Sequence, residues 1–234
     1  MTPSVPPHKI IAEQLSLFGR EKSFDIEEIE KLMAENGIRI FVGVDEAGRG
    51  PLAGPVVAAA VVLGDAFELS GIKDSKELSP AKREELYPLI KRSVMCYAIR
   101  IVGARNIDRW NIREAARIAM KRAVNGVALK LKKEYDLSPQ MVLIDGKDLL
   151  DIRYEQRAVV KGDKRSVSIA AASILAKVYR DRLMMQYHKK FPVYNFAKNM
   201  GYPTAEHIEA LKKFGASPHH RRTFKYVKGE QSQN

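Results

Sequence analysis

Four acidic residues stand where a carboxylate could take part in chemistry. Asp45 and Glu46 end an apolar segment, Asp145 ends a second one, and Asp163 follows a third. Asp and Glu are poor strand residues, so acids that directly finish apolar strands need a reason. In an α/β sheet, strand ends and helix starts converge on one edge, where ligands bind. The four carboxylates are therefore candidates for one shared site.

Such a site would be electrostatically unstable without a partner of opposite charge. At ~5 Å and an effective dielectric of 20, each pair of carboxylates repels by roughly 3 kcal/mol. Six pairs come to about 20 kcal/mol at most, more than the ~5–15 kcal/mol that stabilises a whole domain. Either some carboxylates are protonated or divalent cations lie among them. Oxygen donors without His or Cys favour Mg²⁺ or Mn²⁺, and two such ions can promote phosphodiester hydrolysis.

Most of these acids also have an ordinary structural interpretation. Asp163 could be an acid favoured by the dipole at a helix start, and Asp145-Gly146 could be a turn. Asp45 and Glu46 are harder to explain in this way. As neighbours in a strand they point to opposite faces, so both serve one site only if the chain turns at Glu46. The following Ala-Gly-Arg-Gly permits that turn.

The elements that would position these acids alternate between strands and helices. Apolar and β-branched patterns predict strands over residues 38–44, 56–63, 97–102, 141–145 and 158–160. Helices are predicted over residues 23–36, from Ser79-Pro80, from Ile112, over 167–178 with an apolar stripe, and over 204–214. This order predicts an α/β domain with a mixed sheet flanked by helices.

Composition excludes several classes of protein. A single cysteine, Cys96, rules out an intramolecular disulfide and argues against a cysteine zinc site. The longest apolar run, Pro55 to Leu63, is far shorter than the ~20 residues of a membrane helix, and the N-terminal residues lack the apolar stretch of a signal peptide. The glycine-rich bend lacks the Gly-Lys-Ser/Thr ending of a P-loop. We expect a soluble, cytoplasmic protein.

Positive charge is concentrated near the C-terminus. The net charge is +12, and residues 161–234 hold 15 Lys and Arg against 5 Asp and Glu, a net of +10. This distribution indicates a polyanionic partner such as nucleic acid, although a simple solvated surface is an equal alternative. The five histidines are interpreted as mostly surface groups, and His219-His220-Arg221-Arg222 as either a phosphate contact or a solvated basic loop.

The segment Gly43–Val56 (GVDEAGRGPLAGPV) resembles ribonuclease HII, the type 2 ribonuclease H family. The likeness covers roughly residues 38–226 and continues, in the family's order, through the segments 74–78, 111–120, 145–146, 161–163, 168–178 and 201–204. The related ribonuclease HIII, which has a Gly-Thr-Gly loop, fits worse because this chain has Gly48-Arg49-Gly50.

The resemblance implies an RNase H-like fold with a helical C-terminal extension. The expected division is an N-terminal extension (1–37), a catalytic domain (38–195) and a basic helical extension (196–234). It also implies a monomeric hydrolase of DNA replication and repair. With Mg²⁺ or Mn²⁺, two ions during catalysis, it would cleave RNA in RNA–DNA hybrids. It would also nick DNA duplexes at embedded ribonucleotides, leaving 3′-hydroxyl and 5′-phosphate ends.

The resemblance assigns roles to individual residues. The four acids would be catalytic and bind the metal ions. Gly48, Arg49 and Gly50 match a loop whose backbone contacts the ribose 2′-hydroxyl, and Tyr202 matches a tyrosine that stacks on the sugar at the cleavage point. Lys76 matches a lysine near the substrate backbone. Two alternatives stay open: a nucleic-acid-binding module without catalysis, and a different nuclease of the same fold, such as a junction resolvase.

Overall fold

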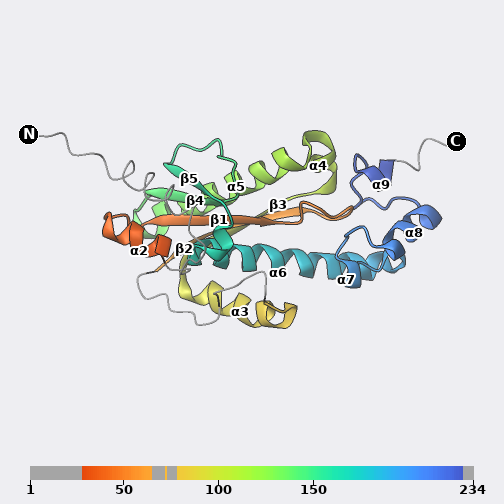
Figure 1. The fold of residues 1–234 in the computed structure, drawn as a ribbon, viewed down its shortest axis with the longest axis horizontal. Helices are drawn as coiled ribbons and strands as arrows, with labels where there is room; N and C mark the ends of the chain where they lie inside the picture. The colour runs from red at the N-terminus through yellow and green to blue at the C-terminus, as the bar shows by residue number, and fades with distance from the viewer. Residues whose placement is uncertain (1–27, 65–71, 73–77, 229–234) are drawn as a thin grey trace, which may run out of the picture.

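A five-stranded mixed sheet forms the centre of the fold (Figure 1). The computed structural model describes residues 28–64, 72 and 78–228. The strands lie in the order β3-β2-β1-β4-β5. Their bounds are β1 Phe41–Ala47, β2 Val56–Leu63, β3 Val94–Val102, β4 Met141–Asp145 and β5 Gln156–Val159. β1, β2 and β3 pair antiparallel, whereas β4 runs parallel to both β1 and β5.

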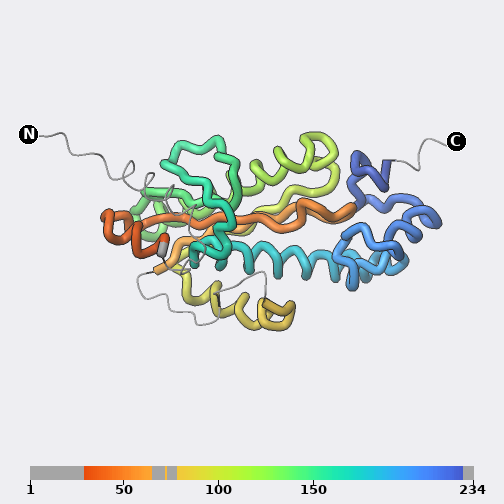
Figure 2. Tube along the Cα trace, viewed as in Figure 1, coloured from red at the N-terminus to blue at the C-terminus, as the bar shows by residue number. Residues whose placement is uncertain are grey.

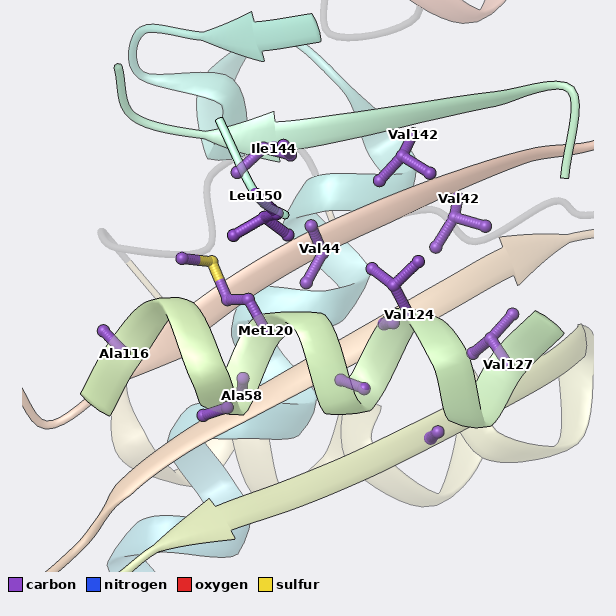
Figure 3. Packing of buried hydrophobic residues seen from close by; sticks show 14 of the residues in the cluster. Val42, Val44, Ala58, Ala116, Met120, Val124, Val127, Val142, Ile144 and Leu150 are labelled. Atoms are coloured by element: carbon purple, nitrogen blue, oxygen red, sulfur yellow. The ribbon is translucent and has the colours of Figure 1, made fainter. Parts of the chain in front are cut away.

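Helices cover both faces of the sheet (Figure 1). One face carries α4 (Ala104–Trp110) and α5 (Ile112–Tyr135), and the other carries α3 (Pro80–Ser93) and α6 (Val167–Lys190). Small side chains let the long helices lie close to the sheet: Ala116, Ala119 and Ala123 of α5 belong to the same buried core as the strand residues of β1, β2 and β4, part of which is drawn in Figure 3. The expected α/β class with a mixed sheet flanked by helices is confirmed.

Several element bounds differ from the sequence prediction. β1 begins at Phe41 and continues through Ala47, where a strand over residues 38–44 was expected, because its ladder with β2 extends to the pair Ala47–Val57. β3 begins three residues before the predicted Tyr97, and β5 ends at Val159. The short helix α4 was not predicted. The helices predicted from Pro80, from Ile112 and over Ala205–Phe214 are confirmed.

The N-terminal helix α2 (Glu28–Glu35) contributes to the core. Only part of the predicted helix over residues 23–36 can be compared, since residues 23–27 lie outside the described residues. Ile29, Leu32 and Met33 pack beneath β1 and β4. Glu30 accepts hydrogen bonds from the Ser168 N–H at 3.1 Å and the Ser166 hydroxyl at 2.6 Å. Helix α2 therefore fixes the start of α6, a role that the sequence did not indicate.

The C-terminal part is built from short helices around a core of its own. These elements are η3 (Pro192–Tyr194), α7 (Phe196–Asn199), α8 (Ala205–Phe214) and α9 (Lys225–Lys228). Their core also takes in Leu52 and Ala53, from the connection between β1 and β2. Figure 2 shows this connection reaching the C-terminal segment. None of the described helices is long and apolar enough to cross a membrane.

Candidate active site

Asp45 and Asp145 lie side by side on neighbouring parallel strands. Val44 pairs with Ile144 in the β1–β4 register, so the next residue on each strand is one of these acids. Neighbouring strands are about 4.8 Å apart, and residues at matching register positions point to the same face. That face is the one covered by α6, since Ala59, which pairs with Asp45, belongs to the core beneath α6.

Asp163 lies in a turn that follows β5 and that is bonded to Asp145. It lies in the 3₁₀ helix η2 (Gly162–Lys164) and is 1% exposed. The preceding residue, Gly162, donates its N–H to Oδ1 of Asp145 at 2.7 Å. A Cβ on Gly162 would lie 2.6 Å from Cδ1 of Ile169 and 3.2 Å from Oδ1 of Asp145, so a larger residue would crowd this approach. The segment carrying Asp163 is thereby tied directly to the carboxylate of Asp145.

Glu46 is positioned differently from the prediction. The chain does not turn at Glu46: the strand continues through Ala47, and the bend begins at Gly48, which has a φ of +97°. Glu46 pairs with Ala58, which faces α5, so the carboxylates of Asp45 and Glu46 leave β1 on opposite faces. Arg49 contacts the Glu46 carboxylate at 3.2 Å. The β1–β4 ladder ends at the pair Val44–Ile144, so β4 does not cover β1 at Glu46. The Glu46 side chain can therefore reach the two aspartates only by passing beyond the end of β4.

The electrostatics of Asp45 couple these acids. Asp45 is 3% exposed. Burial raises its pKa well above the usual range, and the nearby charges of Glu46 and Asp145 raise the pKa further. Hydrogen bonds from the Ser173 side chain and from the Glu46 N–H, the latter at 2.7 Å, act in the opposite direction. The two aspartates and Glu46 are therefore close enough to repel one another.

This donor set fits a hard divalent cation. All four side chains offer carboxylate oxygens, the ligands that Mg²⁺ and Mn²⁺ prefer. A cation beside Asp45 would offset the repulsion that raises its pKa. Within the described residues, no three His, Cys, Asp or Glu side chains converge, as they stand, on one point where a metal ion could be held.

The glycine loop and Tyr202 are brought together by the fold. A Cβ on Gly50 would lie 3.5 Å from Cε1 of the Tyr202 ring, which is van der Waals distance. Tyr202 is 43% exposed, so the ring is available to a ligand. The residue before Tyr202 is Gly201, and its carbonyl accepts a hydrogen bond from the N–H of Leu52, just after the glycine loop, at 2.7 Å. Two segments about 150 residues apart in sequence thus share one surface. Lys76 lies outside the described residues.

Several buried polar residues were not found from the sequence. His207 and His220 are buried, with 2.9 Å between their Nε2 atoms, which corrects the expectation that the histidines lie mostly at the surface. Arg221 is buried as well, so the interpretation of residues 219–222 as a solvated or phosphate-binding loop is wrong for this side chain. Arg180 is buried within α6. A Ser-Pro-His-His-Arg-Arg run gave no sign of which side chains turn inward.

Comparison with known proteins agrees with this architecture. Residues 42–227 match the family model described as Ribonuclease HII. The chain is 52% identical, over 202 residues, to the Ribonuclease HII of Caldanaerobacter subterraneus subsp. tengcongensis, covering 86% of this chain and 80% of that protein. It is 48% identical over 200 residues to the Ribonuclease HII of Syntrophus aciditrophicus, covering 86% of this chain and 91% of that protein.

Solved structures show the same fold. The crystal structure of ribonuclease H2 from Pyrococcus horikoshii OT3 matches with a TM-score of 0.67 and 28% identity, covering 82% of this chain and 97% of that chain. The family match spans most of this chain, and the curated relatives are matched over most of their own length. The chain belongs to the ribonuclease HII family, and it is a hydrolase that acts as an endoribonuclease on RNA–DNA hybrids.

Proposed function

We propose that this ribonuclease H also nicks DNA duplexes at single embedded ribonucleotides, and that it hydrolyses the phosphodiester with two divalent cations held by Asp45, Glu46, Asp145 and Asp163. The observation that carries the proposal is the placement of Asp45 and Asp145 on neighbouring parallel strands, with the Asp163 segment bonded to Asp145. The raised pKa of Asp45 supports it, because clustered carboxylates favour bound cations.

The chemistry is a hydrolysis that leaves a 3′-hydroxyl and a 5′-phosphate. A water oxygen attacks phosphorus, the bond from phosphorus to O3′ breaks, and O3′ takes up a proton. Mg²⁺ or Mn²⁺ would supply activation of the water and neutralisation of charge on the leaving oxygen. The protein residues orient the acids: the Gly162 N–H holds Oδ1 of Asp145, and the Ser173 side chain holds Asp45.

Recognition of RNA requires a contact to the 2′-hydroxyl, the group that distinguishes a ribonucleotide from a deoxyribonucleotide. We assign this contact to the backbone of Gly48, Arg49 and Gly50, and stacking on the adjacent sugar to the exposed ring of Tyr202. The support is the position of Gly50 beside the Tyr202 ring, together with the glycines that permit close backbone approach. A role of Lys76 at the substrate backbone, the monomeric state and the cytoplasmic location remain predictions from the sequence.

Substitution of Asp145 by asparagine tests the site. Asparagine keeps an oxygen that can accept the Gly162 N–H, so we expect Asp145→Asn to keep its fold and duplex binding but to lose cleavage of a duplex with one ribonucleotide. Asp151→Asn is the matched control, because Asp151 is an exposed acid that pairs with Lys121. Full activity of Asp145→Asn, or full activity of the unmodified protein in EDTA, would refute the metal site. Failure to cut at a single ribonucleotide, with hybrid cleavage intact, would refute the substrate assignment alone.

A further inference from the structure

The guanidinium of Arg221 holds the glycine loop by its backbone. Its three nitrogens donate hydrogen bonds to three carbonyls: Nη2 to Gly48 at 2.5 Å, Nη1 to Arg49 at 2.9 Å and Nε to Gly54 at 3.0 Å. The backbone of the same residue takes part, since the Arg221 N–H donates to the Leu52 carbonyl at 2.8 Å. Arg221 therefore contacts the whole connection between β1 and β2 from its inner side.

A second buried arginine extends this arrangement to the segment that carries the tyrosine. Nη2 of Arg180 donates both to the Ala53 carbonyl at 3.1 Å and to the Met200 carbonyl at 3.0 Å. Its Nε donates to the Pro55 carbonyl at 3.1 Å. Arg180 thus joins the glycine-loop connection to the chain two residues before Tyr202.

Burying these two cations together is unfavourable in itself. Burial, together with the charge of Arg180, lowers the pKa of Arg221 to about 9. Both side chains remain charged at neutral pH. The side-chain hydrogen bonds of both guanidiniums go to backbone carbonyls, and the carboxylates of Asp108 and Asp181 favour the charged forms of Arg221 and Arg180 without bonding to them. A simple apolar side chain would fill this space without that desolvation cost.

The hydrogen bonds of Arg221 also fix the direction of the N–H groups in the glycine loop, because each peptide bond is planar. In a trans peptide the C=O and the following N–H point in opposite directions. The carbonyls of Gly48 and Arg49 point inward to Arg221, so the N–H groups of Arg49 and Gly50 point away from it. Gly50 also lies beside the exposed ring of Tyr202, which a Cβ on Gly50 would reach at 3.5 Å. These two N–H groups are therefore presented on the side of the loop opposite the buried guanidinium.

We propose that Arg221 is a positioning residue for ribonucleotide recognition: its guanidinium fixes two peptide planes of the glycine loop, so that the N–H groups of Arg49 and Gly50 face the ribose beside Tyr202. The inference rests on the proposed role of this loop in contacting the 2′-hydroxyl. Lysine cannot replace arginine here, because a single ammonium does not span three carbonyls in the fixed geometry of a planar fork. Arg180 supports the same loop and links it to the tyrosine segment.

The test compares Arg221→Lys with Leu211→Ala in the full-length protein. Leu211 is buried in the C-terminal core, and its apolar side chain makes no hydrogen bond to the loop carbonyls, so Leu211→Ala is expected to destabilise that core while the hydrogen bonds of Arg221 are kept. For each variant, kcat and KM are measured on an RNA–DNA hybrid, the Ki of an all-DNA duplex of the same sequence is measured as a competitor, and the Tm is recorded. The ratio of Ki to KM reports discrimination of RNA from DNA.

We expect Arg221→Lys to lower discrimination by about tenfold, since a displaced charge-assisted hydrogen bond changes affinity by that order. The Ki of the all-DNA duplex should stay within about twofold, because phosphate contacts are unchanged. Leu211→Ala should discriminate RNA from DNA as the unmodified protein does, even when its Tm falls as much as that of Arg221→Lys or more. The proposal is wrong if Arg221→Lys discriminates as the unmodified protein does, or if Leu211→Ala loses discrimination equally. These results are independent of Asp145→Asn, which tests the metal site.

Discussion

Gly50 lies beside the ring of Tyr202, although the two residues come from opposite ends of the family domain. A Cβ added to Gly50 would meet Cε1 of Tyr202 at 3.5 Å, an ordinary van der Waals distance, and the φ of Gly50 lies outside the left-handed region. Neither strain nor a clash therefore requires glycine here for folding. Gly48, in contrast, has a φ of +97°, and a Cβ there would lie 2.2 Å from Nε of Arg180.

Because alanine fits at Gly50 but not at Gly48, substitution of Gly50 tests substrate binding with little effect on folding. We expect Gly50→Ala to keep the free energy of unfolding within ~1 kcal/mol, because its backbone conformation suits alanine. The added methyl group would keep a sugar from approaching the loop, so kcat/KM on a single-ribonucleotide duplex should fall by about 100-fold. Chemical denaturation and steady-state kinetics measure the two effects.

Gly48→Ala is the matched comparison. Its positive φ and its clash with Arg180 should lower the free energy of unfolding by roughly 1–3 kcal/mol or more. A Gly50→Ala protein that is as destabilised as Gly48→Ala, or that cleaves the single-ribonucleotide duplex at the normal rate, would show that Gly50 does not face the substrate.

The buried His207–His220 pair predicts a loss of stability in acid. The Ser217 N–H donates to Nδ1 of His220 at 2.9 Å, so the proton of the neutral ring is on Nε2 and is donated to His207. His207 in turn donates from Nδ1 to the Tyr202 carbonyl at 2.8 Å. An added proton would break this chain of hydrogen bonds. Burial, together with the neighbouring His207 and His219, lowers the pKa of His220 from 6.5 to about 3.

Between pH 6.5 and about 3 the unfolded chain therefore binds a proton that the folded protein does not. The contribution of His220 to the free energy of unfolding is fully present above pH 6.5. Below that value, this contribution falls by up to ~1.4 kcal/mol for each pH unit. We expect urea denaturation to show a steeper fall between pH 7 and pH 4 in the unmodified protein than in His220→Asn, which cannot titrate. Equal slopes in the two proteins would contradict a neutral buried His220.

Local patterns were enough to predict most of the framework. The apolar run Val56–Leu63 became β2 over the same residues, and Ser79-Pro80 began α3 as its cap and first turn. These features depend on neighbours in sequence, since a hydroxyl caps its own helix and a buried strand is apolar along its length. The bounds of β1 were less predictable, because pairing with β2 carries the strand through two acids that have poor strand propensity.

The clustering of the acids was predicted in part, and the buried arginines were missed. The ends of parallel strands meet at one edge, so Asp45 and Asp145 could be placed together without coordinates. Arg221 is buried only because carbonyls about 170 residues earlier in the chain turn toward it. No local pattern distinguishes it from Arg222, the next residue, which is exposed. Such residues depend on long-range backbone geometry, which a sequence pattern does not record.

The repulsion around Asp45 predicts that divalent cations stabilise the fold. A cation that binds only the folded protein adds about 2.7 kcal/mol at ~100 times its Kd. For a chain of this size that corresponds to a rise in Tm of about 5–10 °C. Asp45→Asn removes one charge from the cluster while its oxygen can still accept the Glu46 N–H. We therefore expect this variant to have a Tm in EDTA at least equal to that of the unmodified protein.

The same variant should lose the rise in Tm when Mg²⁺ or Mn²⁺ is added at constant ionic strength, because the site then lacks a central ligand. Asp151→Asn removes an exposed acid that pairs with Lys121, and it should keep the full rise. Differential scanning calorimetry of the three proteins with EDTA, Mg²⁺ and Mn²⁺ measures the effect without any substrate. If Asp45→Asn were stabilised by the cations as strongly as Asp151→Asn, the ions would bind elsewhere, and the paired strand ends of β1 and β4 would not form the metal site.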